Sequence, residues 1–351
     1  MTINIILTLS FFAFSSCKMT KESAVILPNV AIDQTDNFVI FSYSTNGKTG
    51  LYKLQLDNGL VTNWVLPVNG LIFSPNYSKD GTFLIYVMTE KENNKWSNVI
   101  YMSDNSGNNK KRILSLNTNI IDATLTPNGK RIYFTTASII GNSSPIAKPI
   151  AKEMNIYSID IKGEDLKKET HISAYNIGGK LNFDLTGKNL FFQMFNYEKD
   201  SVIKIMEEKN GAFKLHKNCG PYMFNIENKE LRSLVPSNYE NLHNKVNDNF
   251  LLDFLRPVPS NKTQEFFLLS GTTVYKLDLN TLKGDFFYEE PEEDRNRKYH
   301  IQSFIPLSQQ NKFLMVKQID KNENSFFILN QKGEVERIIK PNMESFKNDF
   351  K

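Results

Sequence analysis

The stretch SPNYSKDGTFLIYV, residues 74 to 87, spaces oxygen-bearing side chains as a calcium-binding loop does. Asn76, Ser78 and Asp80 stand at alternate positions and a glycine follows, as in the first half of an EF-hand loop. The bidentate glutamate of such a loop belongs at position 12, which is Val87 here. A loop with one carboxylate would hold calcium weakly. We therefore interpret the stretch as a turn before a strand, and expect no metal ion and no small-molecule cofactor.

Other reactive residues do not complete a motif. STNGKTG, residues 44 to 50, resembles part of a phosphate loop, but Ser42 replaces its first glycine and a hairpin turn is expected. The four histidines show no local zinc spacing, and no Gly-x-Ser-x-Gly element marks a hydrolase nucleophile. Cys219 is interpreted as a packing residue. Carboxylate pairs for glycoside chemistry stay an open alternative, because sequence does not give their separation. No catalytic residue is predicted.

The N-terminus has the pattern of an export signal. INIILTLSFFAF, residues 3 to 14, is almost purely apolar, but it is shorter than the roughly 20 residues that a membrane-spanning helix needs. Ser15, Ser16 and Cys17 follow, and they resemble the lipobox of bacterial lipoproteins. The resemblance implies that Cys17 carries lipid, palmitate included, and becomes the mature N-terminus. An ordinary secretory signal cut near Ser16 is the alternative. A lipidated Cys17 would leave no pair of cysteines for an intramolecular disulfide.

The overall composition is that of an ordinary folded protein. Of 351 residues, 42 are basic and 38 acidic, and the charges are scattered along the chain, so the net charge of +4 marks no surface for phosphate backbones. We expect no nucleic-acid partner. The 26 Phe and 14 Tyr favour strands over helices.

Internal repetition predicts the architecture. The turn and strand of residues 74 to 87 recur closely at TPNGKRIYFTT (126 to 136) and DLTGKNLFFQM (184 to 194). Weaker copies are QTDNFVIFSYS (34 to 44), SNKTQEFFLLS (260 to 270) and SQQNKFLMVKQ (308 to 318). The sequence therefore holds six copies of one turn-and-strand pattern.

A second strand pattern alternates with the first. Its six members are LYKLQLDNG from residue 51, IYMSDNSGN from 100, IYSIDIKGE from 156, YMFNIENKE from 222, VYKLDLNTL from 274 and FFILNQKGE from 326. Short apolar segments flank both patterns, so each period holds four candidate strands. One sheet of this kind cannot bury both its faces alone. We predict an all-β fold, a six-bladed β-propeller with four-stranded antiparallel blades.

The clearest repeats resemble those of a known family. YSKDGTFLIYV followed by NVIYMSDNSGNNKKRIL, and LTPNGKRIYFTT followed by NIYSIDIKGEDLKKET, are similar to the blades of TolB-type propellers. The resemblance covers roughly residues 30 to 340 and implies six blades, in agreement with the count of repeats. It also implies an envelope or periplasmic location, and binding of proteins or glycans or association with enzymes.

The expected domain organisation follows from these patterns. It is a signal peptide at 1–16, a lipid-anchored tether at 17–29, the propeller at 30–340 and a C-terminal tail at 341–351. Residues 24 to 28 either pair onto the last blade to close the ring or lead into the first. Residues 237 to 249 are expected to form a short helix between blades.

Two inserts are the expected recognition surface. Residues 139 to 154 and 197 to 220 are longer than connections between strands need to be, and such loops are often functional. The charged segment 289 to 298 is interpreted as a solvated loop, with a protein-docking site as the alternative. We expect a non-catalytic lipoprotein at the bacterial envelope, on the outer membrane or the periplasmic face, that binds a protein or glycan partner or acts as a scaffold. The alternative function is a glycan hydrolase or lyase acting at the central channel.

Overall fold

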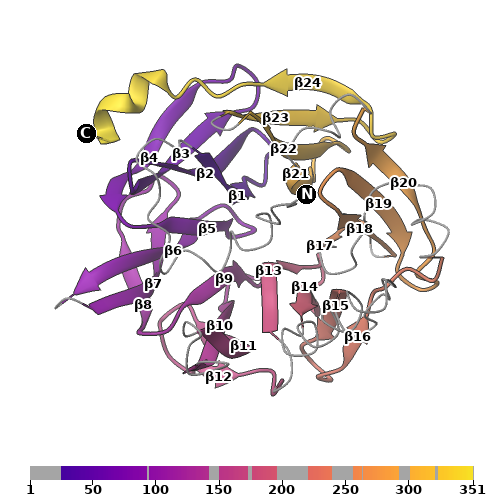
Figure 1. Ribbon diagram of the computed structural model, residues 1–351, viewed down its shortest axis with the longest axis horizontal. Coiled ribbons are helices and arrows are strands. Elements are labelled where there is room, and N and C mark those ends of the chain that lie inside the picture. The colour runs from indigo at the N-terminus through magenta and orange to yellow at the C-terminus, as the bar shows by residue number, and fades with distance from the viewer. Residues whose placement is uncertain are drawn as a thin grey trace, which may run out of the picture.

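The computed structural model confirms the predicted architecture, with six sheets arranged as blades around a common axis (Figure 1). Each blade is an antiparallel sheet of four strands that are consecutive in the chain. The structure describes residues 25–92, 95–141, 150–172, 176–195, 220–238, 256–262, 264–291, 301–320 and 323–350.

The first three blades contain twelve strands. Blade 1 consists of β1 (Val25–Ile32), β2 (Phe38–Thr45), β3 (Lys48–Gln55) and β4 (Val61–Asn69). Blade 2 consists of β5 (Ile72–Tyr77), β6 (Phe83–Glu92), β7 (Lys95–Asp104) and β8 (Lys111–Leu116). Blade 3 consists of β9 (Ile120–Leu125), β10 (Arg131–Gly141), β11 (Ile150–Asp160) and β12 (Lys167–Lys168).

The remaining three blades repeat this order. Blade 4 consists of β13 (Asn176–Phe183), β14 (Asn189–Phe195), β15 (Gly220–Asn225) and β16 (Leu231–Ser233). Blade 5 consists of β17 (Arg256–Pro259), β18 (Glu265–Leu269), β19 (Thr273–Asp278) and β20 (Gly284–Glu289). Blade 6 consists of β21 (Ile301–Pro306), β22 (Phe313–Asp320), β23 (Glu323–Leu329) and β24 (Val335–Ile339), and the 3₁₀ helix η3 (Glu344–Phe350) follows it.

The middle strands of each blade are buried on both faces, which is what the radial stacking of sheets requires. In β2, Val39, Ile40 and Phe41 are all inaccessible to solvent, although successive side chains of a strand point to opposite faces. The outermost strands are more exposed to solvent. In β24, four of five residues are exposed and Ile339 alone is buried. The apolar core therefore lies between blades.

Six apolar clusters among the described residues correspond to the six seams between neighbouring blades. The seam between blades 1 and 2 packs Ile40 and Leu51 against Leu84 and Tyr86. The other five clusters join blades 2 and 3, 3 and 4, 4 and 5, 5 and 6, and 6 and 1 in the same way. Burial of apolar surface at these seams, worth roughly 25 cal/mol per Å², is the main force that holds the ring together.

The ring closes by packing between complete blades. β1 pairs with β2 within blade 1, and among the described residues blade 6 is built from β21 to β24 alone, so residues 25 to 28 of the segment 24 to 28 belong to the first blade. The cluster at the seam between blades 6 and 1 is the largest of the six and includes Phe41, Phe326 and Phe350. Phe41 and Phe326 meet edge to face with their ring centroids 5.6 Å apart.

The C-terminal helix η3 (Glu344–Phe350) packs over this seam, and we call it the latch. Phe350 of η3 is buried, with its ring centroid 5.5 Å from that of Tyr43 and 6.2 Å from that of Tyr52. Asn63 on β4 donates a 2.9 Å hydrogen bond to the carboxylate of Asp349. The C-terminus accordingly lies against blade 1, beside blade 6 (Figure 1). The expected tail at 341–351 is thus partly a helix packed on the propeller.

The structure differs from the sequence-based expectations at two strand boundaries. β1 begins at Val25, because Val25 to Ile32 carry the ladder to β2, so the innermost strand starts before the expected boundary at residue 30. The insert of blade 3 is partly strand, since β10 and β11 lengthen to 11 residues each. Residues 142 to 149, 196 to 219 and 239 to 255 lie outside the described part, and most of the expected inserts and the short helix fall there. Among the described residues, no helix has the length and apolar character needed to cross a bilayer.

Candidate functional site

The oxygens of the calcium-like loop are engaged in local hydrogen bonds. Asp80 accepts from the backbone N–H of Thr82 at 3.1 Å and from its hydroxyl at 2.8 Å. Hydrogen bonds from Ser78 and Thr82 hold the pKa of the Asp80 carboxyl below its usual range. The side-chain oxygen of Asn76 accepts instead from the backbone N–H of Leu125 in the next blade, at 3.1 Å. Asp80 therefore stabilises the β5–β6 turn, and Asn76 joins blade 2 to blade 3.

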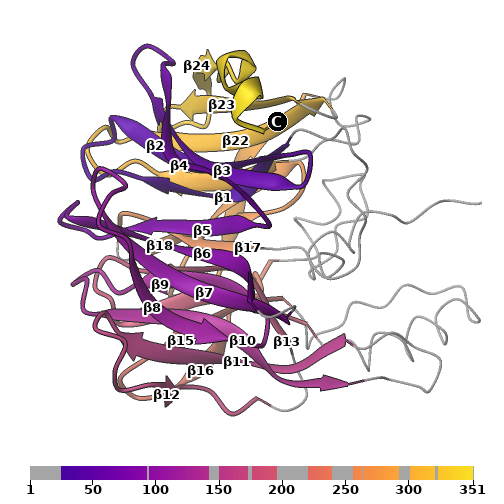
Figure 2. The same ribbon diagram turned by 90° about the vertical axis from the view of Figure 1, so that its left-hand side faces the viewer.

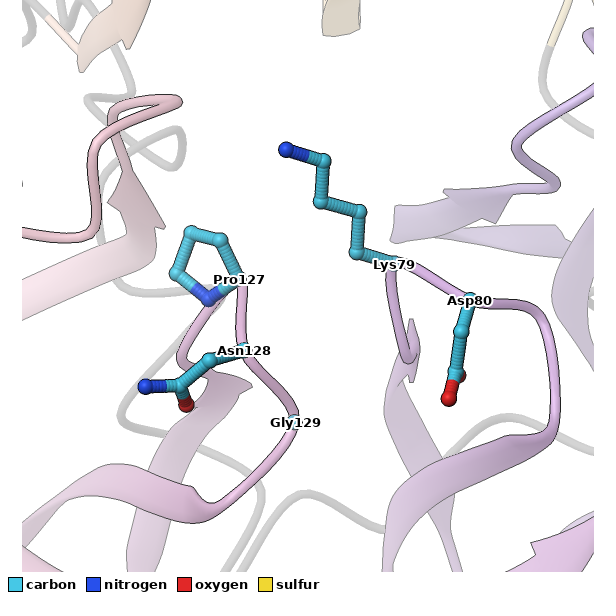
Figure 3. Close-up of a pocket in the computed structure, with 5 residues that line it drawn as sticks. All are labelled: Lys79, Asp80, Pro127, Asn128 and Gly129. Atoms are coloured by element: carbon cyan, nitrogen blue, oxygen red, sulfur yellow. The ribbon is translucent and has the colours of Figure 1, made fainter.

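A shallow hollow of about 270 Å³ lies between this turn and the equivalent turn of blade 3 (Figure 3). Lys79 and Asp80 face Pro127, Asn128 and Gly129 across it, and the lysine points away from the aspartate carboxylate. The Asn128 side-chain oxygen accepts hydrogen bonds within its own turn, from the Thr126 hydroxyl and the Lys130 N–H. The polar groups of this hollow thus mainly stabilise turns.

The six turns give a common reference point for the inner strands. In every blade the first turn residue donates its backbone N–H to the carbonyl five residues later. These first turn residues are Asp33, Ser78, Thr126, Asp184, Ser260 and Leu307. The residue four positions before this first turn residue is therefore the equivalent residue of each inner strand, and in blades 1, 2 and 4 it lies in a β-bulge.

The residues at this equivalent position are all polar and form what we call the central ring. Its members are Asn29, Ser74, Asp122, Lys180, Arg256 and Ser303, one from each blade. All six belong to the innermost strands β1, β5, β9, β13, β17 and β21, which encircle the propeller axis (Figure 1). The repeat therefore places six buried or partly buried polar side chains at one level of the propeller.

Asp122 is the hydrogen-bond acceptor that joins four blades. One of its carboxylate oxygens accepts from Asn29 of blade 1 at 2.9 Å and from the Ser74 hydroxyl of blade 2 at 2.5 Å. The other accepts from the backbone N–H of Leu181 in blade 4, at 2.7 Å. Asp122 itself comes from blade 3 and is buried. One carboxylate therefore fixes the spacing of the inner strands over more than half the ring.

The two cations of the ring bond to backbone carbonyl groups. Lys180 of blade 4 reaches the opposite blade, where its Nζ donates to the carbonyl of Val30 at 3.1 Å. Arg256 of blade 5 donates from its two terminal nitrogens to Gln302 at 2.7 Å and Ile301 at 2.8 Å, both in blade 6. Within the described ranges, no salt bridge joins either cation to a carboxylate.

Burial shifts the ionisation of all three charged residues towards their neutral forms. It raises the pKa of Asp122 to about 6, although the Ser74 hydroxyl, the Leu181 N–H and the charge of Lys180 act in the opposite direction. It lowers the pKa of Lys180, against the opposing effect of Asp122, and lowers the pKa of Arg256 to about 10. The ring is therefore a site where charge is costly and a counter-ion would be stabilising.

The two ends of the propeller differ. The turns after the innermost strands all lie on one face, which we call the turn face, and the hairpins β2–β3, β6–β7 and β10–β11 lie on the opposite, hairpin face. The long β10–β11 hairpin projects from the hairpin face, on the right-hand side of Figure 2. The inner strands begin at the hairpin face, and Arg256 is the first residue of β17. The central ring is thus nearer to that face than the turns are.

The other residues considered from sequence lie apart from this ring. Cys17, Cys219 and three of the four histidines fall outside the described residues, as does most of the charged segment 289 to 298. His171 is exposed. Lys48 begins β3 immediately after a turn at Asn46, so STNGKTG is the predicted hairpin. Within the described part, no group of three or more His, Cys, Asp or Glu could hold a metal ion.

Sequence reasoning missed the central ring. The signal was available, because aligning the six repeats on their turns places a polar residue four positions before each one. Such residues stand out only in that alignment, since Asn29 and Ser303 are unremarkable in their own segments.

Comparison with known proteins identifies the fold. No protein-family model and no curated protein matches the sequence. Solved structures of similar fold include TolB from Acinetobacter baumannii, with 16% identity, a TM-score of 0.48 and coverage of 90% of this chain and 65% of that one. A putative TolB from Agrobacterium tumefaciens has 14% identity, a TM-score of 0.47 and coverage of 75% and 80%. An oligogalacturonate lyase from Vibrio parahaemolyticus has 9% identity, a TM-score of 0.51 and coverage of 86% and 76%.

These likenesses concern the propeller. The chain spans 65% of the length of the Acinetobacter protein. The likeness to the Vibrio protein, at a TM-score of 0.51 and 9% identity, concerns the fold alone. The predicted likeness to TolB-type propellers is confirmed at this level.

Proposed function

We propose that this chain is a non-catalytic binding module of the bacterial envelope, which holds a protein partner against the hairpin face of its propeller. The observation that carries the proposal is the exposed tryptophan Trp96. Its side chain is 55% exposed on β7, at the β6–β7 hairpin, whereas large aromatic side chains elsewhere in the blades are mostly buried. Tryptophan is enriched among the residues that contribute most to protein–protein binding.

The residues around Trp96 fit a protein-binding surface. Trp96 lies near Gly70, in the connection between blades 1 and 2, where a side-chain carbon added to the glycine would come 3.6 Å from the indole. The ammonium of Lys91 is 6.0 Å from the indole ring centroid. Leu66, on β4 shortly before Gly70, is also exposed. A partner that covered this face would bury a large aromatic surface with a cationic neighbour, a combination common at protein interfaces.

The central ring supports the same function by making the scaffold rigid. Hydrogen bonds that Asp122 accepts from three other blades, and that Arg256 donates to blade 6, tie the inner strands to one another. A rigid surface loses little conformational entropy when it binds, so more of the contact energy appears as affinity.

Affinity purification from envelope membranes tests the proposal. The full-length chain, a Trp96→Ala variant and a Leu185→Ala variant are compared by quantitative mass spectrometry. Leu185 is a matched control, because it is an exposed apolar residue (45%) in the β13–β14 turn, on the turn face. We expect a protein that the unmodified chain and the Leu185 variant retain equally and that the Trp96 variant loses by about tenfold or more.

The same purified chain decides between this function and the alternative. Cleavage of envelope or acidic glycans by the chain, with no partner retained, would show that the glycan hydrolase or lyase function is correct. A glycan retained without turnover, and released by the Trp96 substitution, would keep the binding function and replace the protein partner by a glycan.

We also propose that Cys17 carries the lipid anchor. The apolar run, Ser15 and Ser16 before Cys17 support this. Cells fed a labelled palmitate should label the unmodified chain and leave a Cys17→Ser variant unlabelled and free of the membrane fraction. A variant that still carries label and stays in the membrane fraction would contradict the anchor.

A further inference from the structure

We infer that the central ring is a binding site for a carboxylate anion, held between Lys180 and Arg256 at the axis of the propeller. This site is distinct from the surface around Trp96 and does not depend on the protein partner proposed above. Its ligand is recognised by charge and by hydrogen bonds from two cationic side chains.

The first argument is the balance of charge. The ring brings together two cations, Lys180 and Arg256, and one carboxylate, Asp122. Asp122 already accepts hydrogen bonds from Asn29, Ser74 and the Leu181 N–H, and among the described residues it forms no salt bridge with either cation. A cation removed from bulk water is unfavourable unless a counter-charge compensates it. The ring therefore carries one more positive than negative charge, and an anion would balance it.

The second argument is the number of unused hydrogen-bond donors. The guanidinium of Arg256 has five N–H donors, and two nitrogens are paired with the carbonyl groups of Ile301 and Gln302. The ammonium of Lys180 has three donors, of which one bonds to Val30. Neither side chain makes another hydrogen bond within the described part of the chain. Donors that are fixed on one side by carbonyl groups and free on the other are pre-organised for an acceptor.

The third argument is access. Lys180 and Arg256 each keep part of their surface accessible to solvent, in contrast to Asp122 and Ser74, although their charged groups are desolvated enough for the pKa of each to be lowered. Arg256 stands at the start of β17, where the inner strand begins at the hairpin face. Among the described residues, both cations are therefore more accessible than the carboxylate of the same ring.

The chemistry of the site favours a carboxylate. The guanidinium plane of arginine matches the two oxygens of a carboxylate, and a lysine ammonium adds a point charge beside it. The carboxylate has two sources, either a small organic acid or the free C-terminus of a polypeptide. Both offer the same two oxygens, so the experiment separates them by their probes.

Calorimetric titration of the full-length chain at constant ionic strength tests the site. The probes are succinate, its diamide succinamide, the peptide N-acetyl-Ala-Ala-Ala with a free C-terminus, and the same peptide amidated. We expect succinate, the free peptide or both to bind, and the two neutral amides not to bind. Binding of succinate alone would assign the site to small acids, and tighter binding of the free peptide would assign it to chain termini.

Substitutions connect the binding to the ring. Arg256→Gln and Lys180→Gln keep a hydrogen-bond donor and remove a charge, so each should raise the Kd by about tenfold or more. Asp122→Asn removes the competing negative charge and should lower the Kd, an effect that general destabilisation would not produce.

Arg232→Gln is the matched control. Arg232 lies on β16, the outermost strand of blade 4, is partly exposed, and donates a hydrogen bond to a backbone carbonyl as Arg256 does. The Kd of this variant should equal that of the unmodified chain. No binding by any carboxylate would overturn the inference. Binding that Arg256→Gln and Lys180→Gln leave unchanged, while their melting curves stay normal, would overturn it equally.

Discussion

At the scale of the residue, similar polar side chains have different tasks according to their position in the repeat. Asp80, in a turn, is exposed and its pKa is lowered by hydrogen bonds, whereas Asp122, on an inner strand, is buried and its pKa is raised. The sequence suggested ligands at the turn, where oxygens are concentrated. In the structure, the buried charges with shifted pKa values are Asp122, Lys180 and Arg256, each four residues before the first turn residue of its blade. No single segment of the sequence marks these positions.

The raised pKa of Asp122 predicts a specific pH dependence of stability. A pKa of about 6 in the folded chain, above the ordinary value of 3.8, means that the folded state holds its proton more tightly than the unfolded state. The contribution to stability is present below about pH 4 and is lost as the pH rises through 6, by about 3 kcal/mol in total.

Urea unfolding at pH 4 and pH 7 measures this effect. Between these two pH values, Asp122→Asn should gain about 2 kcal/mol of stability relative to the unmodified chain, because the variant has no proton to lose and the unfolded carboxyl is already partly ionised at pH 4. Asp285→Asn is the control, since Asp285 is exposed on β20. An Asp122→Asn variant whose stability differs from that of the unmodified chain by the same amount at both pH values would contradict the assigned pKa.

At the scale of the element, the strands could be predicted from sequence because each repeat carries its own turn. The two strand patterns coincide with the second and third strands of all six blades, from β2 and β3 to β22 and β23. Boundaries set by tertiary contacts could not be predicted in this way. β1 begins at Val25 because β2 offers it a pairing edge, and η3 forms where blade 1 offers Tyr43 and Tyr52 as packing partners.

The turn at Gly333 shows how closely one blade approaches the next. Gly333 has a φ of 82°, and a side-chain carbon there would overlap the backbone carbonyl oxygen of Phe287 in blade 5. Gly47 has a similar φ of 75°, but nothing lies within 4 Å of the same added carbon. Gly47→Ala should therefore cost about 1 kcal/mol from backbone strain alone, and Gly333→Ala on the order of 3 kcal/mol, because blade 6 must also shift.

Chemical denaturation of both glycine variants checks this difference. The free energy of unfolding of the Gly333 variant should be lower than that of the Gly47 variant by about 2 kcal/mol. Equal losses would mean that the turn of blade 6 is free to move away from blade 5.

At the scale of the whole molecule, the described residues close the ring without exchange of a strand between the first and last blades. The apolar seam between blades 6 and 1 and the latch η3 replace that exchange. The number of blades followed from counting repeats, but the mode of closure did not, because the sequence 24 to 28 is equally suited to pairing with either blade. Contacts between chain ends have no local signal in sequence.

Removal of the latch contact tests this mode of closure. Phe350→Ala deletes a buried ring that packs on Tyr43 and Tyr52, and should lower the free energy of unfolding by about 2 to 4 kcal/mol. Ser345→Ala, an exposed position of the same helix, should change it by less than about 0.5 kcal/mol. Urea titration compares the two, and a Phe350→Ala variant as stable as the Ser345→Ala variant would show that the ring closes without η3.

The central claim is that the hairpin face holds a protein partner, and photo-crosslinking in intact cells tests it most directly. A photoreactive residue replaces Lys95, which is exposed beside an intact Trp96, or Leu185 on the turn face. We predict one discrete crosslinked adduct from position 95, lost when Trp96→Ala is added, and none of that size from position 185. Adducts of the same size and yield from both positions, or from neither, would contradict the account.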